Sequence, residues 1–518
     1  MLNLRSSVSA LTLGAILSTT LILGGCGEKN KGDTVKIEKV ATRKVGDAEA
    51  EKALGLMALD TSGSGDFTWS GRKGSGGNYT FSNLATLSKD GEKGAFGSLE
   101  LKGVHMEGTD AAFDQMIFND FTATEDDGST VTFANITLTE PSPALAAAIT
   151  RSFNGDDDAF DDIEGDISFK TLSFSGLKVD DEDGVLTLGT VKMGTDKDDT
   201  GYFTLRDLDA DMLSDGEKII MKLGSIDVTG VNISKYQGLI SAAMDNDGEV
   251  DAGKMKELMG SMNAYDPDFK NFSLKNFNMD VLGLKINLDS MTGKAEKKGG
   301  KVIMSQTMSP LTITPPAEVK DKDMQKFVEG LASFGYDKLE FTMEQNSVLD
   351  EKSDTMIVKD SYIQLKDGFK LSYDYDISGY KAVSEKAMSL NGGSSPNPMA
   401  VLGMLNELKF NHLRLALKDD SIIDRSFKFA ADMQGGAPDA LRMQAKMGLA
   451  FLPMMAKDEG QQKFAGDLSK ALGTLIDDGG TLVIDLSPAK AVDFGAIMQG
   501  SMSGDIDIEA LGITIETK

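Results

Sequence analysis

A β-hairpin of one design recurs four times in the first half of the chain, and this repeat constrains the fold more than any other feature. Each copy has a strand, an Asp-Gly turn and a second strand, with large apolar residues mostly at alternate positions. Asp-Gly supplies the positive φ that a tight turn needs, and the alternation gives each strand one buried face. A Gly or Ala after the first large apolar residue of each second strand indicates a bulge or a close backbone approach. The copies are Phe81–Leu101, Phe118–Leu138, Phe174–Met193 and Leu205–Val228.

The spacing between these copies is too uneven for a short solenoid unit. We therefore predict hairpins laid side by side in one sheet, with helices inserted between some of them. A looser copy spans Phe272–Leu288, and the later pair Leu339–Met343 and Thr355–Leu365 keeps the alternation without the turn. The predicted fold class is mainly β with inserted helices (α+β): an elongated, curved antiparallel sheet of repeated hairpins with a helix-richer C-terminal region.

Six segments carry apolar residues at three- and four-residue spacing, which predicts helices packed on the sheet. Two short strands are expected near the C-terminus, Thr481–Leu486 and Leu511–Glu516. The predicted helices are Pro143–Arg151, Ser234–Met262, Asp321–Phe334, Pro398–Leu408, Pro438–Ala456 and Gln461–Ile476.

The segment Pro310–Pro316 interrupts the strand pattern and predicts a domain change near residue 320. We expect residues 51–320 to form a β-hairpin repeat domain with helical insertions. Residues 321–518 are then a second α+β domain that ends in a helical region and short strands. Residues 1–25 and 26–50 are assigned to a signal peptide and to a tether.

The first 25 residues have the layout of a secretory signal. Arg5 is followed by a mostly apolar run from Ala10 to Leu23, which is shorter than the ~20 residues of a spanning helix. Leu23-Gly24-Gly25-Cys26 then resembles the lipobox of bacterial lipoproteins. The resemblance implies that the Cys26 thiol carries a diacylglycerol, that the signal is removed before it, and that the new amino terminus is, as usual in that family, acylated with a fatty acid such as palmitate.

The residue after Cys26 is Gly27 and not Asp. In this respect the sequence resembles Gram-negative lipoproteins that are sorted to the outer membrane. We therefore expect an envelope protein held through lipidated Cys26 at the outer membrane, facing the periplasm. Acyl chains anchor a protein without a membrane helix. Cys26 is the single cysteine of the sequence, so no intramolecular disulfide can form.

The composition limits the partners. A net charge of −28 repels nucleic acid and anionic head groups, which require Lys and Arg. The 26% of charged residues is ordinary for a soluble globular body. With 28 Met and one Trp, the sequence indicates a soft interior and offers few aromatic platforms for sugars.

Two acidic segments imitate calcium-binding loops, but we expect no Ca²⁺ at either. Asp196–Asp207 ends in Asp where a bidentate Glu is usual, and it overlaps a hairpin turn and strand. Around Asp245–Asp251, alignment on Gly248 puts Ala243 and Lys254 at the two end positions. Acidic turns and a capped helix connection explain both segments.

No catalytic, cofactor-binding or metal-binding residue is predicted. The two histidines, His105 and His412, lie in unrelated strand contexts, and a triad needs a base beside a nucleophile. No Gly-Lys-Ser or Gly-Lys-Thr phosphate loop and no Cys/His metal cluster occur, so no cofactor is expected. Paired carboxylates, as in glycoside hydrolases, remain open.

The strands Phe272–Met279 and Leu339–Met343 and the stretch from Leu413 to Arg425 resemble uncharacterised periplasmic β-repeat proteins of proteobacteria. The body is more distantly similar to elongated β-groove proteins that bind envelope lipids. The tether and the repeated Phe, Leu and Met faces predict a non-catalytic protein that binds lipid or another hydrophobic envelope component along a groove of the sheet, unless those faces form the core under the inserted helices. The alternative is a structural or protein-interaction lipoprotein of the envelope, and a minor alternative is a carboxylate-dependent hydrolase.

Overall fold

The computed structural model describes residues 42–63, 67–86, 94–124, 128–156, 159, 168–195, 200–214, 217–231, 269–317, 319, 322–383, 407–503 and 507–518. The chain divides into two compact units. Unit 1 comprises Met1–Lys254 with Phe272–Phe277, and unit 2 comprises Met255–Asn271 with Asn278–Lys518. Each is mainly antiparallel β with some helices, so the mainly β fold with many hairpins is confirmed.

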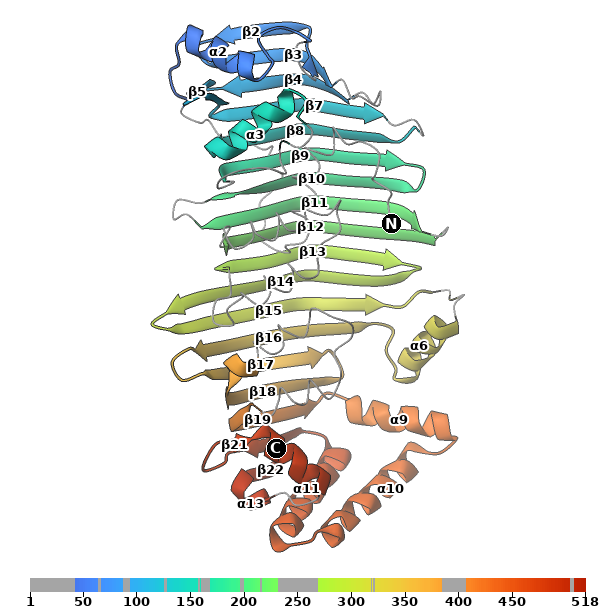
Figure 1. Cartoon of the computed structure of the whole chain (residues 1–518). Coiled ribbons are helices and arrows are strands. Elements are labelled where there is room, and N and C mark those ends of the chain that lie inside the picture. The colour runs from blue at the N-terminus through green and yellow to red at the C-terminus, as the bar shows by residue number, and fades with distance from the viewer. Residues whose placement is uncertain are drawn as a thin grey trace. The chain divides into compact units, whose positions relative to one another are not determined.

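In unit 1, β1 and β2 both pair with β3, and from β3 each strand of the sheet pairs antiparallel with the next. The short strands β5 and β6 form a separate hairpin. All four repeated hairpins pair as predicted (Figure 1). The strands are β1 (Phe67–Thr68), β2 (Gly71–Ser75), β3 (Asn78–Thr86), β4 (Gly94–Lys102), β5 (His105–Glu107), β6 (Asp110–Ala112), β7 (Gln115–Thr124), β8 (Thr130–Pro141), β9 (Phe169–Asp181), β10 (Gly184–Thr195), β11 (Gly201–Ser214) and β12 (Glu217–Val231), with β13 (Asn271–Val281) divided between the units.

One described Asp-Gly turn differs from the expectation. Asp181 pairs with Gly184, so Glu182 and Asp183 form the loop and Gly184 already begins β10. Its positive φ of 147° serves another purpose, because a Cβ there would overlap the carbonyl of Asp211 on β11. The glycine therefore permits close approach of two strands instead of shaping the turn.

A line of backbone irregularities crosses the sheet of unit 1, and we call it the bulge column. Its left-handed members are Asn83, Asp120, Gly176, Asp207 and Asn276. The small residues beside them on neighbouring strands are Gly97, Ala134, Gly189 and Gly224. The predicted close approach at the Gly or Ala of each second strand is thus confirmed.

The bulge column shifts the phase of side-chain alternation. Phe96 pairs with Phe121 and Leu99 pairs with Phe118, while the residues between them include one extra position on each strand. Inward-facing residues therefore fall three apart at the column and two apart elsewhere. This shift explains why the repeat alternates only approximately.

Two helices cover part of the core of unit 1. α2 (Asp47–Leu56) contributes Ala50, Ala53 and Leu54, and α3 (Pro143–Phe153) contributes Leu145, Ile149 and Phe153. The Phe153 ring meets Phe67 at 4.8 Å and Phe118 at 6.3 Å. The tether was expected to reach residue 50, but Val45 already packs on this core and α2 begins at Asp47.

Unit 2 continues the same strand pattern. Each strand from β14 to β19 pairs antiparallel with the next, β19 pairs with β20 and β21, and β20 pairs with β22. The strands are β14 (Leu284–Lys298), β15 (Lys301–Thr314), β16 (Leu339–Asp350), β17 (Thr355–Leu365), β18 (Phe369–Ser378), β19 (Lys409–Asp419), β20 (Thr481–Leu486), β21 (Val492–Asp493) and β22 (Ile513–Thr517).

The domain change expected near residue 320 is not found there, because residues Asn278–Lys518 all belong to unit 2 and the two units divide between Lys254 and Asn278. β15 and β16 pair with each other on either side of that connection. Pro310 falls at a register shift between Met308 and Leu311, where a strand tolerates a residue that lacks an N–H. The proline therefore interrupts the ladder locally without ending the unit.

The helices of unit 2 are α6 (Lys322–Ser333), α9 (Ile422–Gln434), α10 (Pro438–Phe451), the 3-10 turn η1 (Leu452–Met455), α11 (Glu459–Asp478), α12 (Phe494–Ser503) and α13 (Ile508–Leu511). α3, α6, α10 with η1, and α11 confirm four predicted helices, and β20 and β22 confirm both late strands. The predicted helix Ser234–Met262 and most of Pro398–Leu408 lie outside the described residues. α9, α12 and α13 were not predicted; α9 opens with two β-branched isoleucines, which favour strands.

Candidate functional site

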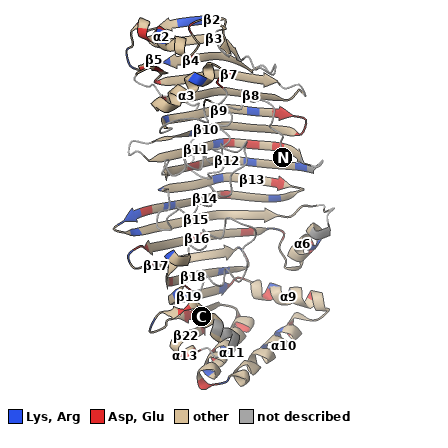
Figure 2. Ribbon diagram, in the orientation of Figure 1, with Lys and Arg blue, Asp and Glu red and all other residues tan. Residues whose placement is uncertain are grey.

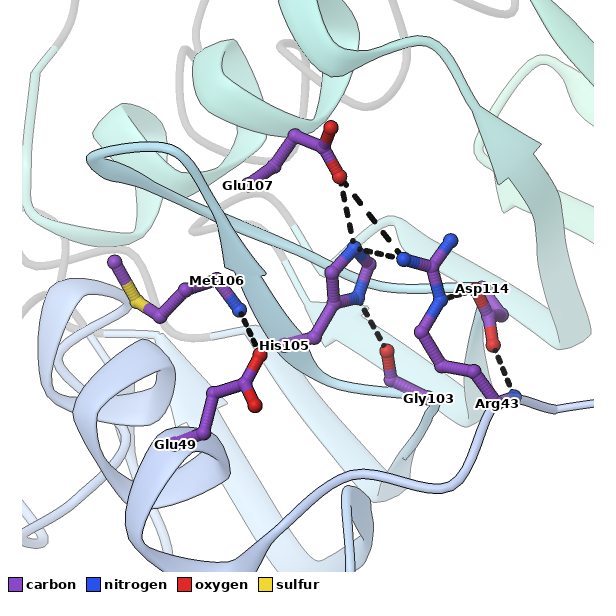
Figure 3. Close-up of polar contacts among 7 residues, drawn as sticks. All are labelled: Arg43, Glu49, Gly103, His105, Met106, Glu107 and Asp114. Atoms are coloured by element: carbon purple, nitrogen blue, oxygen red, sulfur yellow. Dashed lines mark hydrogen bonds and ion pairs between the residues drawn. The ribbon is translucent and has the colours of Figure 1, made fainter.

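The predicted lipidation residue, Cys26, lies outside the described residues. The described chain begins at Thr42. Its second residue, Arg43, is already held in a polar cluster with His105, Glu107 and Asp114 (Figure 3). Arg43 is 71 residues from Asp114 in sequence and 62 from His105. No motif links them, and sequence reasoning missed the cluster.

Asp114 holds Arg43 through two atoms. Its Oδ2 accepts the backbone N–H of Arg43 at 2.8 Å, and its Oδ1 accepts Nε–H at 3.0 Å. The Asp114 side chain is 10% exposed, whereas that of Arg43 is 52% exposed. Gly103, with φ of 67°, leaves the space that this carboxylate occupies, because a Cβ there would overlap it. Asp114 therefore fixes the entry of the chain into unit 1.

His105 is buried next to this pair, at the start of β5. Its Nδ1 lies 2.7 Å from the carbonyl oxygen of Gly103, so we assign the ring proton to Nδ1. Its Nε2 then accepts from Nη1 of Arg43 at 2.7 Å. Glu107 Oε2 lies 3.2 Å from Nε2 and 4.0 Å from Nη1 of Arg43. The guanidinium thus contacts both the imidazole and a carboxylate.

The chemistry of this cluster is that of a clamp. The partners of His105 are a carbonyl, a guanidinium and a carboxylate, and the cluster contains no hydroxyl or thiol that the ring could activate. The arrangement orients the chain at Arg43 and offers no nucleophile.

His412 has a different setting, in unit 2. It lies on β19 beside a register shift, 38% exposed, with Nε2 3.5 Å from Oδ2 of Asp485. Its surface position on a strand is as predicted. Asp485 Oδ2 also lies 3.9 Å from Nη1 of Arg414.

Only part of the two acidic segments lies within the described residues. Asp196–Asp199 and Asp245–Asp251 lie outside the described residues. Gly201 and Asp207 belong to β11, and Asp207 is a member of the bulge column. Within the described parts of the chain, no three Asp, Glu, His or Cys side chains are grouped closely enough to hold a metal ion.

One face of the sheet of unit 2 is rich in apolar side chains, and we call it the apolar face. One row of directly paired residues crosses seven strands and is apolar throughout: Met291, Met308, Met343, Ile363, Leu371, Leu417 and Leu482. The row one residue along lies on the opposite face and is mostly polar: Thr292, Thr307, Glu344, Tyr362 and Ser372. The two faces of this sheet are therefore chemically distinct.

The burial of the apolar face changes along the sheet. At β20 and β22 it is covered by α11, whose Ala471 and Leu475 pack with Leu482 and Ile515. From β14 to β19 most of its side chains are only partly buried, and Ile363 is 37% exposed. A wide apolar surface that keeps partial access is suited to an apolar ligand.

Two tyrosines lie on the apolar face at β18. The rings of Tyr373 and Tyr375 stack with centroids 6.4 Å apart, next to buried Val358 and Met356. Burial raises the pKa of both phenols, and for Tyr375 the neighbouring Tyr373 and Tyr380 raise the pKa further. These hydroxyls place polar atoms among the apolar side chains of this face.

The fold and these sites define an antiparallel hairpin protein with a polar clamp at Arg43 and an apolar sheet face. A model of a family described as "Uncharacterized protein" matches residues 362–518, which run from the middle of β17 to the last residue. No curated protein matches the chain. No helix within the described residues has the length and apolar character needed to cross a bilayer.

Proposed function

We propose that the protein is a non-catalytic lipoprotein of the bacterial envelope that binds lipid or another hydrophobic envelope component on the apolar face of unit 2. The observation that carries the proposal is the row from Met291 to Leu482, apolar on every strand and partly accessible from β14 to β19. Burying such surface against acyl chains is favourable at ~25 cal/mol per Å².

The side chains of this face also suit a ligand of variable shape. Its row contains three methionines, whose unbranched side chains adapt to irregular apolar groups. The phenols of Tyr373 and Tyr375 can hydrogen-bond a polar head or ester group beside the apolar chains. This combination supports an amphiphile as the ligand class.

The first test is to identify what the protein carries. Protein purified from envelopes would be extracted with organic solvent and analysed by mass spectrometry, with the anchor lipid counted separately through its covalent link to Cys26. We expect non-covalent lipid in a fixed ratio to protein. Protein free of non-covalent lipid would contradict the proposal.

The anchor is tested separately. We propose that Cys26 is lipidated and that Gly27 directs the protein to the periplasmic side of the outer membrane, on the lipobox resemblance. Cys26→Ser should leave an uncut precursor or move the protein to the soluble fraction. Normal cutting with unchanged membrane attachment would refute lipidation.

A structural or protein-interaction role is the alternative, and crosslinking in intact cells separates the two. One dominant protein adduct with no bound lipid would favour it.

We also propose that the hairpins form one elongated, curved sheet with a helix-richer C-terminal region, which small-angle scattering and circular dichroism of the two halves can test. The repeated hairpin of the sequence supports this finer description.

A further inference from the structure

The rows of residues that β15–β18 contribute to the apolar face contain no charged side chain, although 26% of the residues of the sequence are charged. The charged residues of these strands, coloured in Figure 2, include Glu340, Glu344 and Lys370, which pair on the opposite face. The rows of the apolar face are, in order, Leu311, Phe341, Leu365 and Phe369; Met308, Met343, Ile363 and Leu371; Gln306, Gln345, Ser361 and Tyr373; Met304, Ser347, Val358 and Tyr375; and Val302, Leu349, Met356 and Ile377.

The third of these rows brings hydrogen-bonding side chains between apolar ones, and we call Gln306, Gln345 and Tyr373 the polar row. Gln306 and Gln345 are directly paired across β15 and β16, which places their Cβ atoms about 4.5–5.5 Å apart. Tyr373 lies on β18, where it pairs with Ser361. All three side chains of the polar row are partly buried. Two adjacent amides and a phenol therefore cross a surface that is otherwise mostly apolar.

The polar row has hydrogen-bonding capacity that the protein leaves unused. Within the part of the chain that the structure describes, no hydrogen bond involves the side-chain amides of Gln306 and Gln345 or the hydroxyl of Tyr373. The neighbouring Ser361 differs, because its hydroxyl accepts the Asn346 N–H at 3.0 Å and donates to the Lys359 carbonyl at 3.1 Å. Partly buried polar groups without protein partners gain from a ligand that hydrogen-bonds them.

The apolar rows on the two sides of the polar row differ in burial. On one side they form a core cluster in which Leu349 and Val358 are fully buried. On the other side Met343 and Leu371 keep partial access, and Ile363 is 37% exposed. An apolar chain of a ligand can therefore lie on this second side, with the polar group of the ligand next to it at the polar row.

The side chains of the polar row restrict the chemistry of that polar group. Amide N–H groups and a phenol O–H are donors, so an uncharged acceptor such as an ester carbonyl complements them. An ionised phosphate or carboxylate would lose hydration on this face without gaining a cationic partner. A diacyl glycerolipid has two ester carbonyls where its chains join, which matches the two adjacent amides. Its head group would stay in water, beyond the face.

We propose that the polar row binds the ester carbonyls of a diacyl glycerolipid, that the acyl chains lie on the rows of Met308 and Leu311, and that the head group is not recognised. The inference rests on the proposed function, because it specifies the ligand of the same face. Its consequence is selectivity for ester-linked chains together with indifference to the charge of the head group.

The test is a competition among lipids of different mass, followed by native mass spectrometry of the full lipidated chain in detergent. The probes are dioleoylphosphatidylglycerol, dioleoylphosphatidylethanolamine and dioleoylglycerol, with the diether analogue of the first, which keeps the chains and the head group but lacks the carbonyls. We expect the diesters to bind within about threefold of each other. The diether analogue should bind about tenfold more weakly, because two hydrogen bonds are lost.

Two variants assign this preference to the polar row. Gln306→Leu combined with Gln345→Leu should bind diester and diether equally well, because the amide donors are gone. Gln364→Leu is the matched control, since Gln364 is also partly buried but pairs with Thr342 and Lys370 on the opposite face. It should keep the preference of about tenfold. Circular dichroism would verify that both variants are folded, and the preference of the unmodified chain needs no variant.

The outcomes separate this inference from the proposed function. Bound lipid without a preference for diester over diether in the unmodified chain would overturn the inference and leave the apolar face as a lipid site. A preference that follows head-group charge, or one that survives the double substitution, would also overturn it. Absence of any bound lipid, or a concentration-dependent dimer in its place, would overturn both.

Discussion

Replacing Gly103 by Ala tests how the chain is fastened at its entry into unit 1. The added Cβ would overlap the Asp114 carboxylate, which accepts both the backbone N–H and the Nε–H of Arg43. Gly108→Ala is the control, because Gly108 has a similar φ of 63° but open space around its Cβ position. Any difference between the variants therefore reports the lost carboxylate contacts and not the left-handed backbone.

The magnitudes follow from these contacts. A non-glycine residue in a left-handed conformation costs about 1–2 kcal/mol, and this applies to both variants. Displacing a buried carboxylate from two hydrogen bonds adds about 1–3 kcal/mol each, at the lower end here because Arg43 is half-exposed. We expect Gly103→Ala to lower the free energy of unfolding of unit 1 by about 3–5 kcal/mol and Gly108→Ala by about 1–2 kcal/mol.

Two assays measure this difference. Guanidinium unfolding followed by Trp69 emission reports on unit 1, because the single tryptophan lies there. Trypsin should cut after Arg43 and Lys44 faster in Gly103→Ala than in Gly108→Ala. Equal destabilisation by both substitutions, with equal cleavage rates, would refute the role assigned to the Asp114 clamp.

Two further predictions concern the bulge column and the tyrosines. Asp207 has φ of 53°, so Asp207→Val should destabilise unit 1 by about 1–2 kcal/mol in denaturant unfolding and Asp207→Gly should not; equal effects would contradict the bulge column. Burial raises the pKa of Tyr373 and Tyr375 in the folded state. The two phenols therefore contribute fully to the stability of unit 2 below the pKa of an unfolded tyrosine, about 10. This contribution is lost as the pH rises through the higher pKa of the folded state. Unit 2 should therefore lose stability in alkali, and Tyr373→Phe with Tyr375→Phe should reduce that loss; an unchanged alkaline profile would count against burial of the phenols.

The sequence was sufficient to predict the hairpins, because strand alternation is a local signal. It did not reveal the phase shift at the bulge column. The left-handed positions of the bulge column are occupied by different residue types that all tolerate this backbone conformation, so no repeated residue marks them in the sequence. They are Asn83, Asp120, Gly176, Asp207 and Asn276. The glycines beside them gave the only visible sign.

The polar clamp could not be predicted for another reason. Arg43 and Asp114 lie 71 positions apart, both outside the regular elements, and each looks like an ordinary surface charge in the sequence. The apolar face was expected from the alternation, but which strands α11 would cover depends on the packing of Leu475 against Leu482. Partial access to the remaining strands is a property of the tertiary structure alone.

The proposed ligand site is tested most directly by two matched substitutions in unit 2. Ile363 on the apolar face and Ile303 on the opposite face are 37% and 44% exposed, so an aspartate at either position should cost similar stability. Binding would be measured with a photoactivatable phospholipid, and the crosslinked peptides would be identified by mass spectrometry. We predict that Ile363→Asp abolishes crosslinking to β16–β18 and that Ile303→Asp retains it. Equal crosslinking in both variants, or adducts confined to other strands, would contradict the apolar face as the binding surface.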